Sequence, residues 1–141
     1  MAISTIDTLT ERLNSVQDRL SMALSAANVG IWDWDLVNGK MVWDARMFDL
    51  FGIDPSGFSG SYDDFVRCLI ESDKWLVAQA LHDSLNNKTK LDITYKLTTV
   101  PHRILHSVGQ CCYDIKGDPV RFIGVCVELK CNRLACDNRL L

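Results

Sequence analysis

The chain has 141 residues, enough for one domain, and its 15 Lys and Arg against 18 Asp and Glu leave a formal net charge of −3. Apolar residues make up 48% and charged residues 23%, as in soluble domains, which excludes a disordered or collagen-like chain. The acidic excess argues against nucleic-acid binding, and no secretion signal or membrane span is evident. We therefore expect a cytoplasmic chain without membrane contact.

Residues 1–28 are predicted to form an amphipathic helix, capped at Ser4 or Thr5 and ended by Gly30. Its apolar residues recur at alternating steps of three and four, the spacing of a heptad seam. The seam consists of Ile6, Leu9, Leu13, Val16, Leu20, Ala23 and Ala27. Two interpretations are open. Either the helix folds back on its own domain, or the seam joins two copies into a homodimer, which is the interpretation we favour.

A β-hairpin is predicted next, because the apolar period changes from 3.6 to two at Gly30. Residues 31–36 alternate apolar and acidic side chains, Asn38-Gly39 is a tight-turn signal, and residues 40–43 alternate again. The alternation places Trp32 and Trp34 on one face of the first strand. Met41 and Trp43 share a face of the second strand.

Three short helices are predicted after the hairpin. Asp44 caps a helix that ends at Gly52, Ser61 begins a second that runs to about residue 70, and Ser72 caps a third over residues 73–86. The third carries one apolar stripe with a second row beside it. The stripe is Trp75, Ala78, His82 and Leu85, and the second row is Val77 and Leu81.

Three strands are predicted to complete the domain. They cover residues 91–97, 103–113 with a bulge at Gly109, and 120–129. The last is almost wholly apolar, as expected of a central strand packed on both faces. The order helix, two strands, helices, three strands predicts an α+β fold with its helices on one side of an antiparallel sheet. Residues 131–141 are typical of the start of a further helix.

The sequence gives no sign of a catalytic or metal site. It lacks a nucleophile elbow, a phosphate loop and a dinucleotide motif, so we expect no enzymatic activity in this chain. The six cysteines are interpreted as reduced thiols. A zinc site at Cys126, Cys131 and Cys136 is an alternative that the absence of a CxxC pair disfavours.

The sequence resembles a PAS sensor domain of the subtype common in bacterial signalling proteins. The resemblance rests on short motifs in a specific order and covers about residues 20–131. These motifs are Ile31-Trp32-Asp33-Trp34-Asp35-Leu36, Asn38-Gly39, Met41-Val42-Trp43, Leu50-Phe51-Gly52-Ile53-Asp54-Pro55, Ile93-Thr94-Tyr95-Lys96-Leu97 and Gly117-Asp118-Pro119-Val120-Arg121-Phe122-Ile123-Gly124-Val125. The chain departs from the family at Glu128-Leu129-Lys130, where Asp-Ile-Thr is usual.

The resemblance implies a five-stranded antiparallel sheet with helices on one face and a ligand pocket between them. The candidate pocket residues are Trp32, Trp34, Met41, Trp43, Leu69, Ala78, His82, Tyr95, Leu97 and Phe122. An alternative is that these side chains simply fill the core. An inward His82 would also suit haem iron, whereas the flavin-binding cysteine motif of a related branch is missing, since Arg67-Cys68-Leu69 is only a fragment of it.

The resemblance also implies a sensory function. Residues 29–130 would be the sensor domain, and residues 131–141 the start of a helix leading to an output domain such as a histidine kinase, a diguanylate cyclase or a chemoreceptor. Glu128, Leu129 and Lys130 would transmit the signal. The alternatives are a ligand-free dimerisation module and a haem-based gas or redox sensor using His82.

Overall fold

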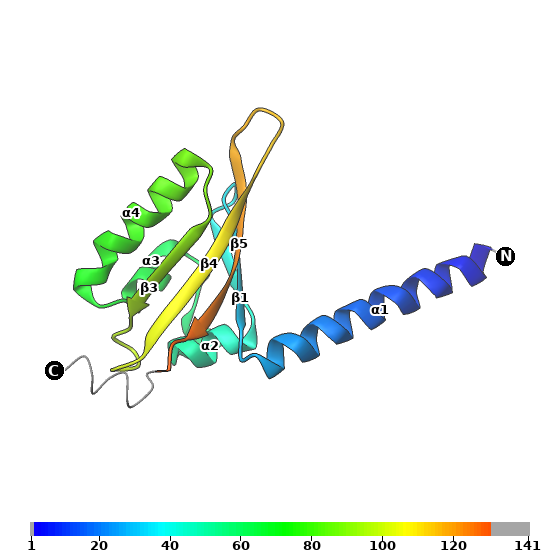
Figure 1. The fold of residues 1–141 in the computed structure, drawn as a ribbon, viewed down its shortest axis with the longest axis horizontal. Coiled ribbons are helices and arrows are strands. Elements are labelled where there is room, and N and C mark those ends of the chain that lie inside the picture. Colours follow the sequence, from blue (N-terminus) through cyan, green and yellow to red (C-terminus); the bar gives the residue numbers. More distant parts are fainter. Residues whose placement is uncertain (1, 131–141) are drawn as a thin grey trace.

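The computed structural model describes residues 2–130 as a long helix, α1 (Ala2–Ala26), that projects from an α+β domain (Figure 1). The predicted fold class is confirmed. The strands are β1 (Gly30–Asp35), β2 (Lys40–Trp43), β3 (Leu91–Lys96), β4 (Ile104–Tyr113) and β5 (Pro119–Glu128). The helices between β2 and β3 are α2 (Ala45–Phe51), the 3₁₀ turn η1 (Pro55–Gly57), α3 (Tyr62–Arg67) and α4 (Glu71–Asn87). The helix expected over 131–141, with Cys131 and Cys136 of the zinc alternative, lies outside the described residues.

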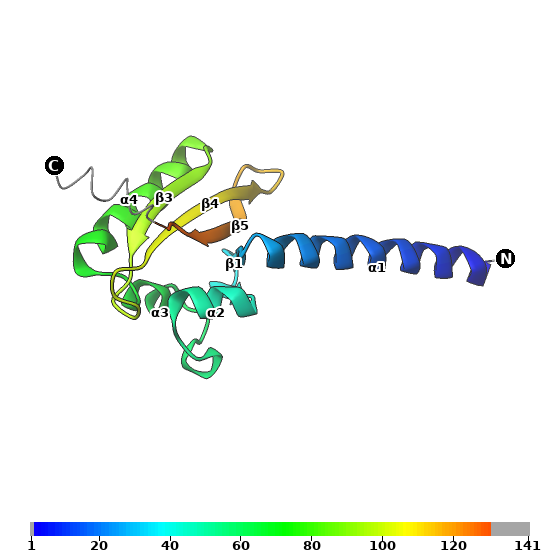
Figure 2. The same ribbon diagram turned by 60° about the horizontal axis from the view of Figure 1, so that its bottom comes forward.

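The five strands form one antiparallel sheet in the order β2-β1-β5-β4-β3. The N-terminal hairpin therefore joins the C-terminal meander through the β1–β5 pair, in which Trp32 lies opposite Gly124. Helices α2, α3 and α4 cover one face of this sheet, and α1 leaves the domain at the start of β1 (Figure 2). The core lies between the sheet and these three helices.

Local signals in the sequence account for several element ends. The carboxylate of Asp44 accepts a hydrogen bond from the amide of Met47 at 3.0 Å and caps α2, which ends at Gly52 with a left-handed φ of 66°. The hydroxyl of Ser61 accepts from the amide of Asp64 at 3.1 Å and caps α3. The predicted Asp44 cap, the end of α2 at Gly52 and the start of α3 after Ser61 are confirmed.

Other predicted boundaries were wrong. Helix α4 begins at Glu71 rather than after Ser72, and its N-cap residue, Ile70, makes no side-chain cap. Helix α3 ends at Arg67, because Leu69 instead pairs with Leu97 in an isolated β-bridge. Gly30 belongs to β1 and does not end α1, which stops at Ala26.

The two long strands correct two further expectations. Gly109 pairs regularly with Gly124, and the bulge lies between Cys112 and Tyr113. Strand β5 is central in the sheet, as predicted, but only its inner face is covered by helices. On its outer face, Val125 is 38% exposed.

Candidate ligand cavity

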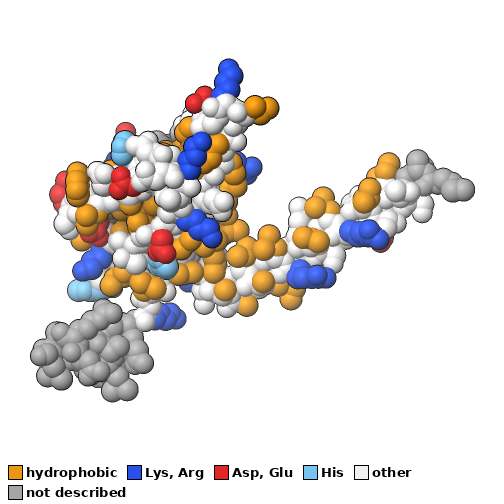
Figure 3. Space-filling model, turned by 45° about the horizontal axis from the view of Figure 1, so that its top comes forward, with side chains coloured by type: hydrophobic (Ala, Val, Ile, Leu, Met, Phe, Trp, Pro, Cys, Tyr) orange, Lys and Arg blue, Asp and Glu red, His pale blue; other side chains and the backbone are white. Residues whose placement is uncertain are grey.

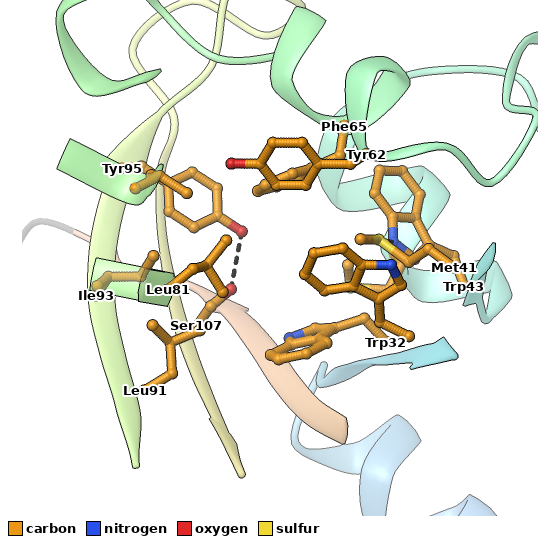
Figure 4. Close-up of a pocket in the computed structure, with 13 residues that line it drawn as sticks. Trp32, Met41, Trp43, Tyr62, Phe65, Leu81, Leu91, Ile93, Tyr95 and Ser107 are labelled. Atoms are coloured by element: carbon orange, nitrogen blue, oxygen red, sulfur yellow. Dashed lines mark hydrogen bonds between the residues drawn. The ribbon is translucent and has the colours of Figure 1, made fainter. Parts of the chain in front are cut away.

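A partly open cavity of about 30 Å³ lies between the sheet and helices α2, α3 and α4. Strands β1–β4 supply most of its walls, and α4 closes the side opposite the hairpin. The lining residues are Trp32, Trp34, Met41, Trp43, Met47, Tyr62, Phe65, Val77, Leu81, Leu91, Ile93, Tyr95 and Ser107. In Figure 4, Tyr95 and Leu81 face Trp32 and Met41 across the cavity, with Tyr62 and Phe65 above them. A space of this volume holds one or two waters, far less than a typical ligand pocket.

Half of the ten predicted pocket residues line this cavity. The structure brings together Trp32, Trp34, Met41, Trp43 and Tyr95. Three others are buried in the core outside the cavity lining, namely Leu69, Leu97 and Phe122. Phe122 packs against the Trp32 ring with 5.4 Å between centroids, so it supports the wall from below.

The prediction that Ala78 and His82 face the pocket was wrong, since both lie on the exposed face of α4. The His82 imidazole instead lies 2.8 Å from the side-chain amide of Asn86, one helical turn away. The inner face of α4 is formed by Val77, Leu81 and Ser84. Ser84 is tolerated there because its hydroxyl donates to the carbonyl of Thr89 at 2.6 Å.

Haem does not fit this site. With His82 outside, the described residues that line the cavity include no histidine to bind the iron. The cavity volume of about 30 Å³ is also far below that of a porphyrin.

Eight lining residues were absent from the sequence-based set: Met47, Tyr62, Phe65, Val77, Leu81, Leu91, Ile93 and Ser107. The apolar spacing of the helices already pointed to Val77 and Leu81 as an alternative face. Ser107 carried no signal, because a polar residue inside a strand gives no indication of which partner will satisfy it.

The polar groups at the β3–β4 end of the cavity are satisfied within the protein. The Tyr95 hydroxyl lies 2.8 Å from the Ser107 hydroxyl and 3.7 Å from the Cys126 sulfur. Burial raises the pKa of the Tyr95 hydroxyl well above its usual value and also raises the pKa of the Cys126 thiol. Both groups are therefore neutral at physiological pH.

The three tryptophans of the cavity differ in their hydrogen bonding. The Trp43 indole N–H donates to the Met41 sulfur at 3.0 Å. Among the residues described, none accepts from the buried indole N–H groups of Trp32 and Trp34. A buried donor without an acceptor is costly, by about 1–3 kcal/mol.

Trp32 and Trp34 are held in different ways. Trp32 lies against Gly109 and Gly124, where a β-carbon would come within 2.4 Å and 2.2 Å of its ring. These two glycines therefore make room for the indole on the sheet. Trp34 is only half-buried and stacks on Tyr62, with 5.4 Å between centroids and 10° between planes.

The end of β5 is tied to α2 by Arg103. Its Nη1 donates to the carbonyls of Asp49 and Leu50 at 3.0 and 2.8 Å, at the C-terminal end of α2. Its Nε lies 3.4 Å from a carboxylate oxygen of Glu128. The next amide, of Leu129, donates to the carbonyl of Ile104 at 2.9 Å. The predicted transmission residues thus begin at a junction of three elements.

No group of three or more His, Cys, Asp or Glu side chains between residues 2 and 130 is placed to hold a metal ion. Four cysteines in this range are free thiols, at positions 68, 111, 112 and 126. In the same part of the chain, no helix has both the length and the hydropathy to cross a bilayer.

A five-stranded antiparallel sheet with helices enclosing a small cavity against one face defines the class of PAS sensor domains, as the sequence resemblance implied. A family model described as "PAS fold" matches residues 40–126, more than half of the chain, so the chain belongs to the PAS fold family. This fold is a non-catalytic module, so the chain by itself is not an enzyme.

One relative matches most of this chain. The chain is 24% identical over 122 residues to the probable diguanylate cyclase DgcE of Escherichia coli (strain K12), a match over 85% of this chain and 11% of that protein. It spans only about a tenth of that relative.

Solved structures share the fold. A sensory box histidine kinase/response regulator from Burkholderia thailandensis E264 superposes with a TM-score of 0.69 and 23% identity, covering 86% of this chain and 92% of that one. The N-terminal domain of a diguanylate cyclase with PAS/PAC sensor from Marinobacter aquaeolei superposes with a TM-score of 0.63 and 12% identity. The match covers 78% of this chain and 98% of that one.

Proposed function

We propose that this PAS domain is a sensory module in which occupancy of the cavity changes the position of the chain exit at Glu128, Leu129 and Lys130. The observation that carries this proposal is the physical connection between the two. Met47 lines the cavity from α2, and the carbonyls at the C-terminal end of the same helix bind Arg103. A shift of α2 therefore acts on the Arg103–Glu128 ion pair.

The packing of α2 connects the helix directly to the cavity. Phe51, at the C-terminal end of α2, packs against the cavity residue Trp43, with 4.5 Å between centroids and the rings tilted by 37°. Together with Met47, this places a contact with the cavity wall near each end of the helix. A ligand shifts an equilibrium only if it binds two arrangements with different affinity. A ligand larger than the space of about 30 Å³ would bind better to an arrangement in which a cavity wall is displaced.

The receiver of this signal would lie after residue 130. A diguanylate cyclase is one candidate output, supported by the relative DgcE, and a histidine kinase or chemoreceptor are the others. We place the module in the cytoplasm, a compartment in which its free thiols persist.

Coupling can be tested without a known ligand by filling the cavity. Val77→Leu adds one methylene to the wall, and Ala78→Leu adds a larger group to the exposed face of the same helix as a control. We expect Val77→Leu to speed hydrogen exchange at the Leu129 amide, and Ala78→Leu to leave it unchanged. In a chain that already carries Arg103→Met, adding Val77→Leu should cause no further change in exchange at the Leu129 amide. If Val77→Leu folds but leaves Leu129 exchange unchanged, the proposal is wrong.

A second proposed function, dimerisation through α1, is favoured by a separate observation. The seam residues of α1 are exposed to similar degrees, between 55% and 61%: Ile6, Leu9, Leu13, Val16 and Leu20. Figure 3 shows apolar side chains along the length of α1 and on the adjoining surface of the domain. A helix of this kind is marginal alone in water and is stabilised by burying its apolar face.

We propose a second copy of this chain, in parallel orientation, as the occupant of this seam. In a parallel pair, Arg12 and Arg19 face Gln17 and Leu24 of the other copy, without like-charge contacts. In an antiparallel pair centred on the seam, Arg12 would face Arg19 and repel it. The charges therefore favour the parallel arrangement.

Light scattering after size exclusion tests the dimer. Leu13→Asp should give a monomer, whereas Asn14→Asp, which adds the same charge beside the seam, should remain dimeric. Leu9→Cys should form a disulfide with itself in a parallel dimer, identified by mass spectrometry. A monomeric wild-type chain, or a dimer that survives Leu13→Asp, would show that α1 is not the interface.

A further inference from the structure

We infer that the cavity takes a small, neutral ligand carrying a hydrogen-bond acceptor, such as a carbonyl oxygen, that binds the indole N–H groups of Trp32 and Trp34. This inference rests on the proposed sensory function and specifies the chemistry of the ligand. It combines three observations: the unpartnered donors, the absence of charge in the lining, and the half-buried position of one wall.

The two indoles are the unsatisfied groups of this site. Trp32 is 6% exposed, and its N–H and that of Trp34 are buried without an acceptor among the described residues. The two residues are two positions apart in β1, so their side chains project from the same face of the strand. Trp43, in contrast, already donates to Met41. An acceptor placed near Trp32 and Trp34 would recover hydrogen bonds that the protein does not make by itself.

The other polar groups of the lining do not call for a ligand. Tyr95 and Ser107 satisfy each other at 2.8 Å. The described lining residues include no Lys, Arg, His, Asp or Glu, so a charged ligand would lose its hydration without gaining a counter-ion. Carboxylates, phosphates and ammonium compounds are therefore disfavoured, and a neutral acceptor is favoured.

Access to the indoles requires one wall to move. The Trp34–Tyr62 stack is that wall, because both rings are only partly buried, whereas Trp32 is seated on Gly109 and Gly124. Figure 4 shows Tyr62 on the helix side of the cavity, above Trp32. Separating this pair enlarges the space of about 30 Å³ and brings the ligand to the Trp34 indole.

Three probes of similar shape represent a neutral acceptor, a hydrocarbon and a charged ligand. They are cyclohexanone, methylcyclohexane and cyclohexanecarboxylate. Binding is followed by the indole N–H signals of the ¹⁵N-labelled chain, assigned by single Trp→Phe variants. We expect cyclohexanone to move the Trp32 and Trp34 indole protons downfield, as hydrogen bonding does, and to leave Trp75, which is 68% exposed, unmoved. Methylcyclohexane should bind about tenfold more weakly, and the carboxylate should not bind.

The variants provide the matched control. Trp34→Phe should weaken cyclohexanone binding while leaving the downfield shift of the Trp32 indole proton, whereas Trp75→Phe should change neither the affinity nor that shift. Equal binding of the ketone and the hydrocarbon would overturn the inference and leave the proposed sensory cavity intact. Preferred binding of the carboxylate, or no binding of either neutral probe, would also overturn it. The exchange experiment at Leu129 judges the proposed function independently.

Discussion

Alanine at position 109 would test how Trp32 is seated, and with it the geometry of the cavity wall. A β-carbon at Gly109 would lie 2.4 Å from Cη2 and 2.5 Å from Cζ2 of Trp32, and 3.1 Å from Cε1 of Phe122. Favourable carbon contacts are about 3.5–4 Å, so the indole would have to move by roughly 1 Å. Phe122 is fully buried below it, so the open direction is toward the cavity.

The expected magnitude follows from two opposing effects. Overpacking of a filled core costs about 1–3 kcal/mol. Replacing glycine by alanine also restricts the unfolded chain, which stabilises the fold by about 0.4–1 kcal/mol where the backbone permits alanine. We therefore expect Gly109→Ala to lower the free energy of unfolding by about 1–2 kcal/mol.

Urea denaturation followed by circular dichroism measures this change. Gly57→Ala is the control, because no atom lies within 4 Å of its β-carbon position, and it should be neutral or slightly stabilising. Trp32→Phe removes the crowded ring atoms, so the double variant with Gly109→Ala should be more stable than the sum of the single changes by about 1 kcal/mol. A Gly109→Ala variant as stable as the Gly57→Ala control would refute this account of Trp32.

Three further predictions concern ionisation and the chain exit. Burial raises the pKa of Tyr95 above its usual value of 10.0, so the unfolded chain releases this proton at lower pH than the folded chain does. The free energy of unfolding should therefore fall as pH rises above about 10. Tyr95→Phe should show a smaller fall in urea titrations. The hydrogen bond from Arg121 lowers the pKa of Asp33, so the stabilisation by this pair is complete above the unfolded pKa near 3.8 and disappears as pH falls through the lower folded value. Asp33→Asn should accordingly lower the melting temperature at neutral pH and have no effect in strong acid. Arg103→Met should speed amide exchange at Leu129, because it breaks the link between α2 and Glu128, and unchanged exchange would contradict that role.

Local sequence signals were sufficient to predict the elements whose cause is local. The hairpin follows from a two-residue period on either side of Asn38-Gly39, and α2 follows from the Asp44 cap and the left-handed Gly52. The cavity residues of the hairpin could be predicted for the same reason, because alternation alone decides that Trp32 and Trp34 share a face. Family motifs then supplied the arrangement of the strands.

The chain's own sequence thus determined the α+β class, the hairpin and the aromatic side of the cavity, since each depends on a period or a turn a few residues long. Only the tertiary structure decided which side of α4 faces inward. Its two apolar rows are nearly equivalent in sequence, and in the fold Val77 and Leu81 face inward together with Ser84, whose hydroxyl donates to the carbonyl of Thr89. The tertiary structure also decided the volume of the cavity. This volume is a small difference between the space enclosed by the sheet and helices and the volume of the side chains that fill it.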